Sequence, residues 1–164
     1  MRLNFRFKLG GVTVFFMISH TQTLEGVTSK VGNNEHLIFW DLEKCSLKEA
    51  EEKLRQIQRE FGLGNIFITS DAEGSYRAWC FSRRSWLEYL HILIHSFPML
   101  DYGFWVWTVR RGASTLRISN KKGRPPQKVV SLLKGYEETE VPEKLTHVIY
   151  DTGIEKRGKV INIG

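Results

Sequence analysis

The chain has 164 residues, of which 41% are hydrophobic, 12% aromatic and 26% charged. This length and composition predict one folded domain with a sizeable core and argue against wholesale disorder. The only cysteines, Cys45 and Cys80, have no CxxC spacing, which argues against a disulfide scaffold or a structural zinc site. The apolar run at residues 14–18 is too short for a membrane span or a secretory signal. We therefore expect a soluble intracellular protein without a membrane partner.

The net charge of +6 is concentrated in one part of the sequence. Residues 102–136 contain eight Lys and Arg and neither Asp nor Glu, so this window carries +8 and the remainder carries −2. A basic block of this kind is compatible with a nucleic-acid partner, although net charge alone does not establish one.

The start of the chain predicts a β-hairpin and a buried strand. Apolar residues alternate with polar ones on both sides of a Gly-Gly pair, which predicts a hairpin over residues 1–18. Residues 19–35 are polar and contain Gly, so we expect a loop with some extended chain. Residues 37–42 are almost entirely apolar, which is typical of a buried strand.

Two helices are signalled by capping boxes. Ser46 with Glu49 precedes an apolar stripe of spacing three and four, which predicts a helix over residues 46–61. Ser85 with Glu88 opens a second, aromatic-rich helix that ends near residue 96. Strands are expected over residues 65–69, 76–81, 104–109, 114–118 and 146–150, and a strand or short helix over residues 128–133. This order predicts an α+β fold with helices packed against a mostly antiparallel sheet.

Three acids are candidate metal ligands. Asp41 and Glu43 alternate on one strand and therefore project to the same side. Asp101 is the only acid between Glu88 and Glu137, and it precedes the basic block. Carboxylate oxygens suit Mg²⁺ or Mn²⁺. The alternative is structural: a solvent-facing strand end for the pair, and a turn cap for Asp101.

Two segments are candidate phosphate contacts. Residues 66–81 place a small-residue turn, which includes Ser70 and Gly74, between two strands, and such turns can direct N–H groups at a phosphate. The segment from Arg117 to residue 126 includes Lys121 and Arg124, and it is the most nucleic-acid-like stretch of the chain. An ordinary β-hairpin and a solvated basic loop are the competing interpretations.

In this order, the segments resemble the archaeo-eukaryotic primase superfamily, which includes small primase-polymerases of plasmids and phages. The resemblance covers about residues 36–133, with residues 1–18 as an N-terminal hairpin and residues 137–164 as a C-terminal extension of the same domain. The predicted hairpin of this chain carries Arg77 at the position where the family usually has His. Each motif is short, so the resemblance depends on order and spacing.

The resemblance implies an RRM-like core with template-dependent primase or polymerase activity. Asp41, Glu43 and Asp101 would hold two Mg²⁺ or Mn²⁺ ions that align a primer 3′-oxygen with an incoming nucleoside triphosphate. Phosphates of the nucleotide or of template-primer DNA would be contacted by the remaining candidates, namely Ser70, Gly74, Arg77, Arg117, Lys121 and Arg124.

Other classes of function remain open. A non-catalytic single-stranded nucleic-acid-binding protein would use the aromatic residues together with the basic block, and a small structural or regulatory protein would need neither. A rolling-circle initiator needs a His-x-His pair, which the sequence lacks. His91 and His95 are spaced to bind a metal on a helix, but surface or packing roles are more common for such residues. The sequence does not indicate an oligomeric state.

Overall fold

The computed structural model describes residues 2–19, 21–32, 34–120, 123–139, 145–153 and 160–162. Its contacts divide the chain into two units, residues 1–25 with 149–164, and residues 26–148. No helix in the described part is both long and apolar enough to cross a membrane.

The smaller unit is built on the N-terminal hairpin that the sequence predicts. Strand β1 (Arg2–Leu9) pairs antiparallel with β2 (Val12–Ser19). Both glycines of the connecting turn have positive φ, 54° at Gly10 and 84° at Gly11, a conformation that glycine adopts without steric cost. A short strand that the sequence did not predict, β10 (Val160–Asn162), pairs parallel with β1.

The larger unit contains a four-stranded antiparallel sheet in the order β4-β6-β5-β8. Its strands are β4 (Glu35–Glu43), β5 (Ile66–Ala72), β6 (Ser75–Ser85) and β8 (Lys128–Leu133). Helix α1 (Leu47–Glu60) connects β4 to β5, and β6 lies between these two strands, antiparallel to both. This split β-α-β unit is the arrangement found in ferredoxin-like and RRM-like folds. The predicted α+β fold with a mostly antiparallel sheet and an N-terminal hairpin is confirmed.

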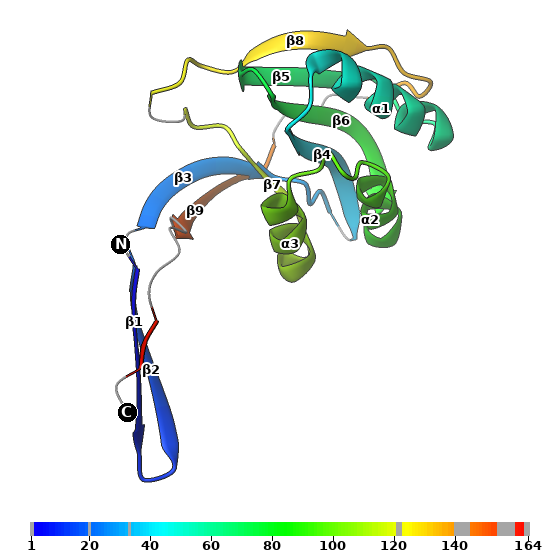
Figure 1. Ribbon diagram of the computed structural model, residues 1–164. Helices are drawn as coiled ribbons and strands as arrows, with labels where there is room; N and C mark the ends of the chain where they lie inside the picture. The colour runs from blue at the N-terminus through cyan, green and yellow to red at the C-terminus, as the bar shows by residue number, and fades with distance from the viewer. Residues whose placement is uncertain are drawn as a thin grey trace. The chain divides into compact units, whose positions relative to one another are not determined.

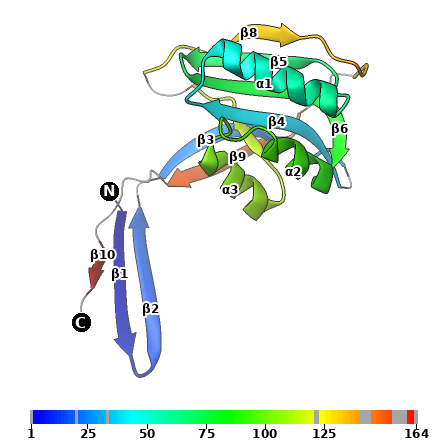
Figure 2. The same ribbon diagram turned by 45° about the vertical axis from the view of Figure 1, so that its right-hand side comes forward.

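Helices pack against this sheet through their apolar side chains. Helix α1 begins at the predicted capping box of Ser46 and Glu49 and lies across the sheet (Figures 1 and 2). Helix α2 (Trp86–Ile94) begins at the second predicted capping box, and both views place it beside α3 (Tyr102–Arg111), next to β4. The buried side chains of α1 join the core together with those of β4, β5 and β6, including Ala50, Leu54, Ile57, Ile38, Trp40, Leu42, Ile66, Ile68 and Ala78.

A second, three-stranded sheet has the order β7-β3-β9. It consists of β3 (Thr21–Thr28), β7 (Thr115–Arg117) and β9 (His147–Gly153). The division between the two units falls within β3 and within β9. Strand β3 lies in the segment for which the sequence predicted mainly a loop, and β7 and β9 coincide with predicted strands.

The prediction of a strand over residues 104–109 was wrong, because these residues belong to helix α3. Asp101 caps its N-terminus through a hydrogen bond from the Phe104 N–H, and Gly112 ends it with φ of 66°, in the left-handed region. The aromatic run offers no clear period, since nearly every position is apolar. The two terminal caps therefore decide the local structure.

The outer edge of β4 is closed by hydrogen bonds from other elements. The Leu37 N–H donates to the Ser29 carbonyl at 2.8 Å. The hydroxyl of Tyr89, on α2, donates to the Phe39 carbonyl at 3.0 Å and accepts from the Phe39 N–H at 3.3 Å. Tyr89 is fully buried and also contacts the Ser114 hydroxyl, and burial raises the pKa of its phenol. One side chain thus replaces a neighbouring strand at this point of the edge.

Replacing Tyr89 with Phe tests this role of the hydroxyl. We expect Tyr89→Phe to lower the free energy of unfolding by about 1–3 kcal/mol, because two buried backbone groups of Phe39 lose their partner. Urea denaturation followed by circular dichroism measures the change. Tyr102→Phe is the matched control, since Tyr102 is 72% exposed, and its effect should stay below about 0.5 kcal/mol. Equal effects of the two substitutions would contradict the assigned role.

Candidate functional site

The structure brings Asp41 and Asp101 to opposite positions although they are far apart in sequence. An isolated antiparallel bridge joins Leu42 to Leu100, and the Asp101 N–H donates to the Asp41 carbonyl at 2.8 Å. Asp41 lies on β4, and Asp101 is the N-cap of α3. The chain that connects α2 to α3 therefore extends the edge of the sheet by one short bridge, and the backbones of Asp41 and Asp101 pair there.

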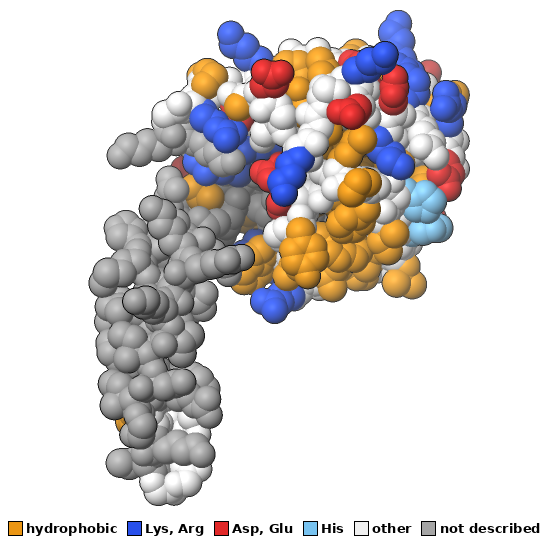
Figure 3. Space-filling model, viewed as in Figure 1, with side chains coloured by type: hydrophobic (Ala, Val, Ile, Leu, Met, Phe, Trp, Pro, Cys, Tyr) orange, Lys and Arg blue, Asp and Glu red, His pale blue; other side chains and the backbone are white. Residues whose placement is uncertain are grey.

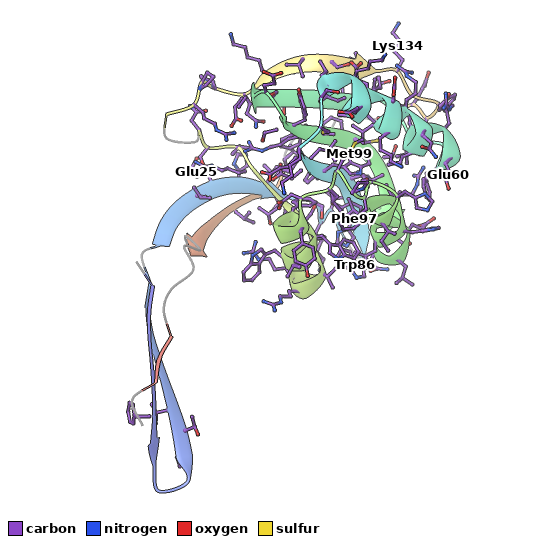
Figure 4. The ribbon with its side chains drawn as sticks, viewed as in Figure 1. Glu25, Glu60, Trp86, Phe97, Met99 and Lys134 are labelled. Carbon is purple, nitrogen blue, oxygen red and sulfur yellow. The ribbon has the colours of Figure 1, made fainter. Side chains whose placement is uncertain are left out.

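Glu43 lies at the end of β4, two residues beyond Asp41. Its backbone N–H donates to the Met99 carbonyl at 2.9 Å, and Figure 4 shows Met99 close to β4. Asp41 and Glu43 face the same side of the strand by their alternation. All three candidate ligands are thus carried by one strand end and the segment paired with it. The carboxylate of Asp101 is also used locally, because its Oδ1 accepts the hydrogen bond that caps α3.

The described residues do not contain a group of three or more His, Cys, Asp or Glu side chains arranged to hold a metal ion. The register adds a positive neighbour, since Arg77 on β6 stands opposite Asp41. Side chains directly opposite on antiparallel strands lie on the same face of the sheet. The face that carries Asp41 therefore also carries a guanidinium group.

Arg77 is the most constrained charged residue of this site. Its side chain is only 6% exposed, and one nitrogen donates to the Arg117 carbonyl at 2.8 Å. A second nitrogen lies 4.0 Å from a carboxylate oxygen of Asp71, whose side chain is 3% exposed. Asp71 also accepts a hydrogen bond from Arg124 at 2.9 Å. Burial is tolerated because each charge has a partner of opposite sign.

Sequence reasoning missed Asp71 because it assigned residues 70–74 to a turn. Strand β5 continues to Ala72, so the reversal of the chain is shorter than predicted. An irregularity in the pairing of β5 with β6 falls at Asp71. No sequence signal identifies this pairing, because it depends on the register that sets Thr69 opposite Arg77 and on the irregularity at Asp71.

Ser70 and Gly74, which were predicted to contact a phosphate, shape the turn between β5 and β6. The Ser70 hydroxyl lies 2.7 Å from the Ala72 carbonyl and 2.9 Å from the Ser75 carbonyl, and it accepts from the Ala72 N–H. Gly74 has φ of 74°, which places it in the left-handed region that closes the turn. Both residues are needed for the shape of the hairpin. Their predicted role toward a phosphate stays a prediction.

The side chain of Arg117 binds the backbone of the predicted basic loop. Arg117 donates from Nε to the carbonyl of Ser119 at 2.9 Å, and another of its nitrogens donates to the Asn120 carbonyl. Arg124 is partly exposed and is bound to Asp71. Lys121 lies outside the described residues, and its predicted contact with phosphate is a prediction only.

Comparisons of the chain with models of protein families, with curated proteins and with solved structures find no match.

The two arginines that contact Asp71 should differ in their contribution to stability. We expect Arg77→Gln to lower the free energy of unfolding by about 3 kcal/mol, because it removes a buried charge from a buried carboxylate and leaves the Arg117 carbonyl without its donor. Arg124→Gln should cost only about 1 kcal/mol, because Arg124 is partly exposed to water. Chemical denaturation of both variants measures the difference. A larger effect of Arg124→Gln would show that Arg77 does not organise the site.

Proposed function

We propose that the protein is a core of the primase–polymerase type, which adds nucleotides to a nucleic-acid strand with the help of divalent cations. The observation that supports this function is the bridge at Leu42 and Leu100, which sets Asp41 opposite Asp101. Paired acids at one sheet edge repel each other unless a cation lies nearby. The order of the sequence motifs supports the same class of function.

The donor atoms fit a hard divalent cation, because Asp41, Glu43 and Asp101 offer only oxygen. Asp41, on β4, and Asp101, on the segment paired with β4, would hold Mg²⁺ or Mn²⁺ together. Glu43 would contribute a ligand from the end of the strand. A cation bound there would stabilise the negative charge that develops during transfer of a nucleotide. Arg77 would hold Asp71 and the Arg117 backbone in place around an incoming nucleoside triphosphate.

Primer extension tests this proposal directly. Full-length protein is incubated with primed and unprimed templates, labelled nucleoside triphosphates and Mg²⁺ or Mn²⁺. We expect extension to fall by a factor of about 100 or more in Asp41→Asn and in Asp101→Asn, because each removes one cation-binding charge.

Glu52→Gln is the matched control for these two variants. Glu52 is an exposed acid on α1 that pairs with Lys48, so its loss should leave extension unchanged. Wild-type protein that binds the template but extends no primer under either metal would contradict the catalytic proposal and favour binding alone.

A second candidate, single-stranded nucleic-acid binding without catalysis, is favoured by the surface of α3. Trp107 is 51% exposed, and the guanidinium groups of Arg110 and Arg111 lie 5.6 Å and 4.9 Å from its ring centre. Figure 3 shows apolar side chains gathered over α2 and α3, with a basic side chain at the border. An exposed indole offers a stacking platform for a base, and the arginines offer charge for its phosphates.

Substitution of Trp107 distinguishes a specific binding role of α3 from non-specific hydrophobic binding. We expect Trp107→Ala to weaken binding to a labelled single-stranded oligonucleotide about tenfold, which corresponds to the loss of one stacked base. Fluorescence anisotropy at low and moderate salt measures the affinity.

Leu87→Ala is the control, because Leu87 is an apolar α2 residue that is 77% exposed. The affinity of this variant for the oligonucleotide should match that of the wild type. Equal weakening by both substitutions would contradict the role of Trp107. An affinity of the wild type that does not change with salt would contradict the role of the arginines.

A further inference from the structure

Two histidines on α2 form a pair that the proposed nucleotide site does not use. His91 and His95 are four residues apart, so they share one face of the helix. Their Nε2 atoms are 3.2 Å apart, and the ring centres are 4.9 Å apart. Figure 3 shows histidine side chains at the edge of the molecule with an acidic side chain nearby. The nitrogens of the two rings therefore converge at the surface.

Glu60 fixes the orientation of one of these rings. It is the last residue of α1, labelled in Figure 4, and its carboxylate lies 3.2 Å from Nδ1 of His95. An Nδ1–H that donates to a carboxylate leaves the lone pair on Nε2, which is the nitrogen that faces His91. A carboxylate behind an imidazole is also the usual way in which proteins orient a metal-binding histidine.

The ring of Phe61 contacts both imidazole rings. Its ring meets the ring of His91 edge-on at 5.3 Å and the ring of His95 at 5.1 Å, with interplanar angles of 85° and 90°. Phe61 is partly buried and packs against the core, which limits its own movement. The pair is thus held by contacts from α1 before any ligand binds.

We propose that His91 and His95 bind one divalent transition-metal ion of the zinc class, with Glu60 as a positioning residue. Two nitrogens that each lie 2.0–2.1 Å from a tetrahedral Zn²⁺ are about 3.3 Å apart, close to the separation of the two Nε2 atoms. His91 is exposed and His95 partly exposed, so water occupies the remaining coordination positions. Imidazole favours Zn²⁺, Ni²⁺ and Cu²⁺ over Mg²⁺, which separates this site from the carboxylates around Asp41.

A direct hydrogen bond between the two imidazoles is the competing explanation of the same distance. In that case the Nε2–H of His91 donates to Nε2 of His95, and the pair needs no metal. The two explanations differ in a measurable way, because only the metal site makes zinc affinity depend on both histidines.

Calorimetric titration of the full-length, chelator-treated protein with zinc chloride and with nickel chloride tests the proposal. We expect one ion bound per chain, with affinity at least about tenfold lower in His91→Gln and in His95→Gln. Glu60→Gln should weaken binding about tenfold, because the ring of His95 loses its orienting partner. His147→Gln is the matched control, since His147 is an exposed histidine outside the pair, and it should bind like the wild type.

The same experiment keeps this proposal separate from the nucleotidyl-transfer proposal. Asp41→Asn should bind zinc as the wild type does, and magnesium chloride should give no heat attributable to the histidine pair. Circular dichroism verifies that each variant is folded. Absence of zinc binding by the folded wild type, or equal affinity in both histidine variants and the wild type, would overturn the metal site, whatever the outcome of primer extension.

Discussion

The arrangement of the larger unit depends on the hydrogen bonds along the outer edge of β4. This strand is buried on both faces, so its outward N–H and C=O groups cannot be left to water. Alternate residues find partners in three other places: Leu37 in Ser29, Phe39 in the hydroxyl of Tyr89, and Asp41 in the chain before α3. Closing this edge positions α2 and α3, and it also sets Asp101 opposite Asp41. The candidate site is therefore a consequence of completing the sheet.

Charge is distributed around this edge by the same packing. The basic block that the sequence shows as one window has several roles in the fold. Arg110 and Arg111 flank an exposed indole on α3, whereas Arg117 binds the Ser119 carbonyl and Arg124 binds Asp71. A basic stretch in sequence is thus divided between an open surface, where it can meet a ligand, and an inner network, where it balances buried acid.

The predicted helices that proved right are those with a complete local signal. The two capping boxes and the apolar stripe of α1 describe interactions within a few residues, and both helices begin where these signals place them. The aromatic run at residues 104–109 had no clear period and was misjudged as a strand. Asp71 was misjudged for a related reason, because small polar residues suggest a turn until the partner strand is known. Of the candidate site, Asp41, Glu43, Asp101 and the arginines could be named in advance, but neither Asp71 nor the strand register could.

By itself, the sequence determined the helices with capping boxes, the hairpin at Gly10-Gly11 and the residue types available for chemistry. It did so because capping, alternation and left-handed turns are interactions between near neighbours. Only the tertiary structure decided that Asp41 lies opposite both Asp101 and Arg77, that Arg77 holds Asp71, and that the rings of His91 and His95 are backed by α1. These juxtapositions join residues that are distant along the chain. They depend on strand register and helix packing, which the burial of the core as a whole decides.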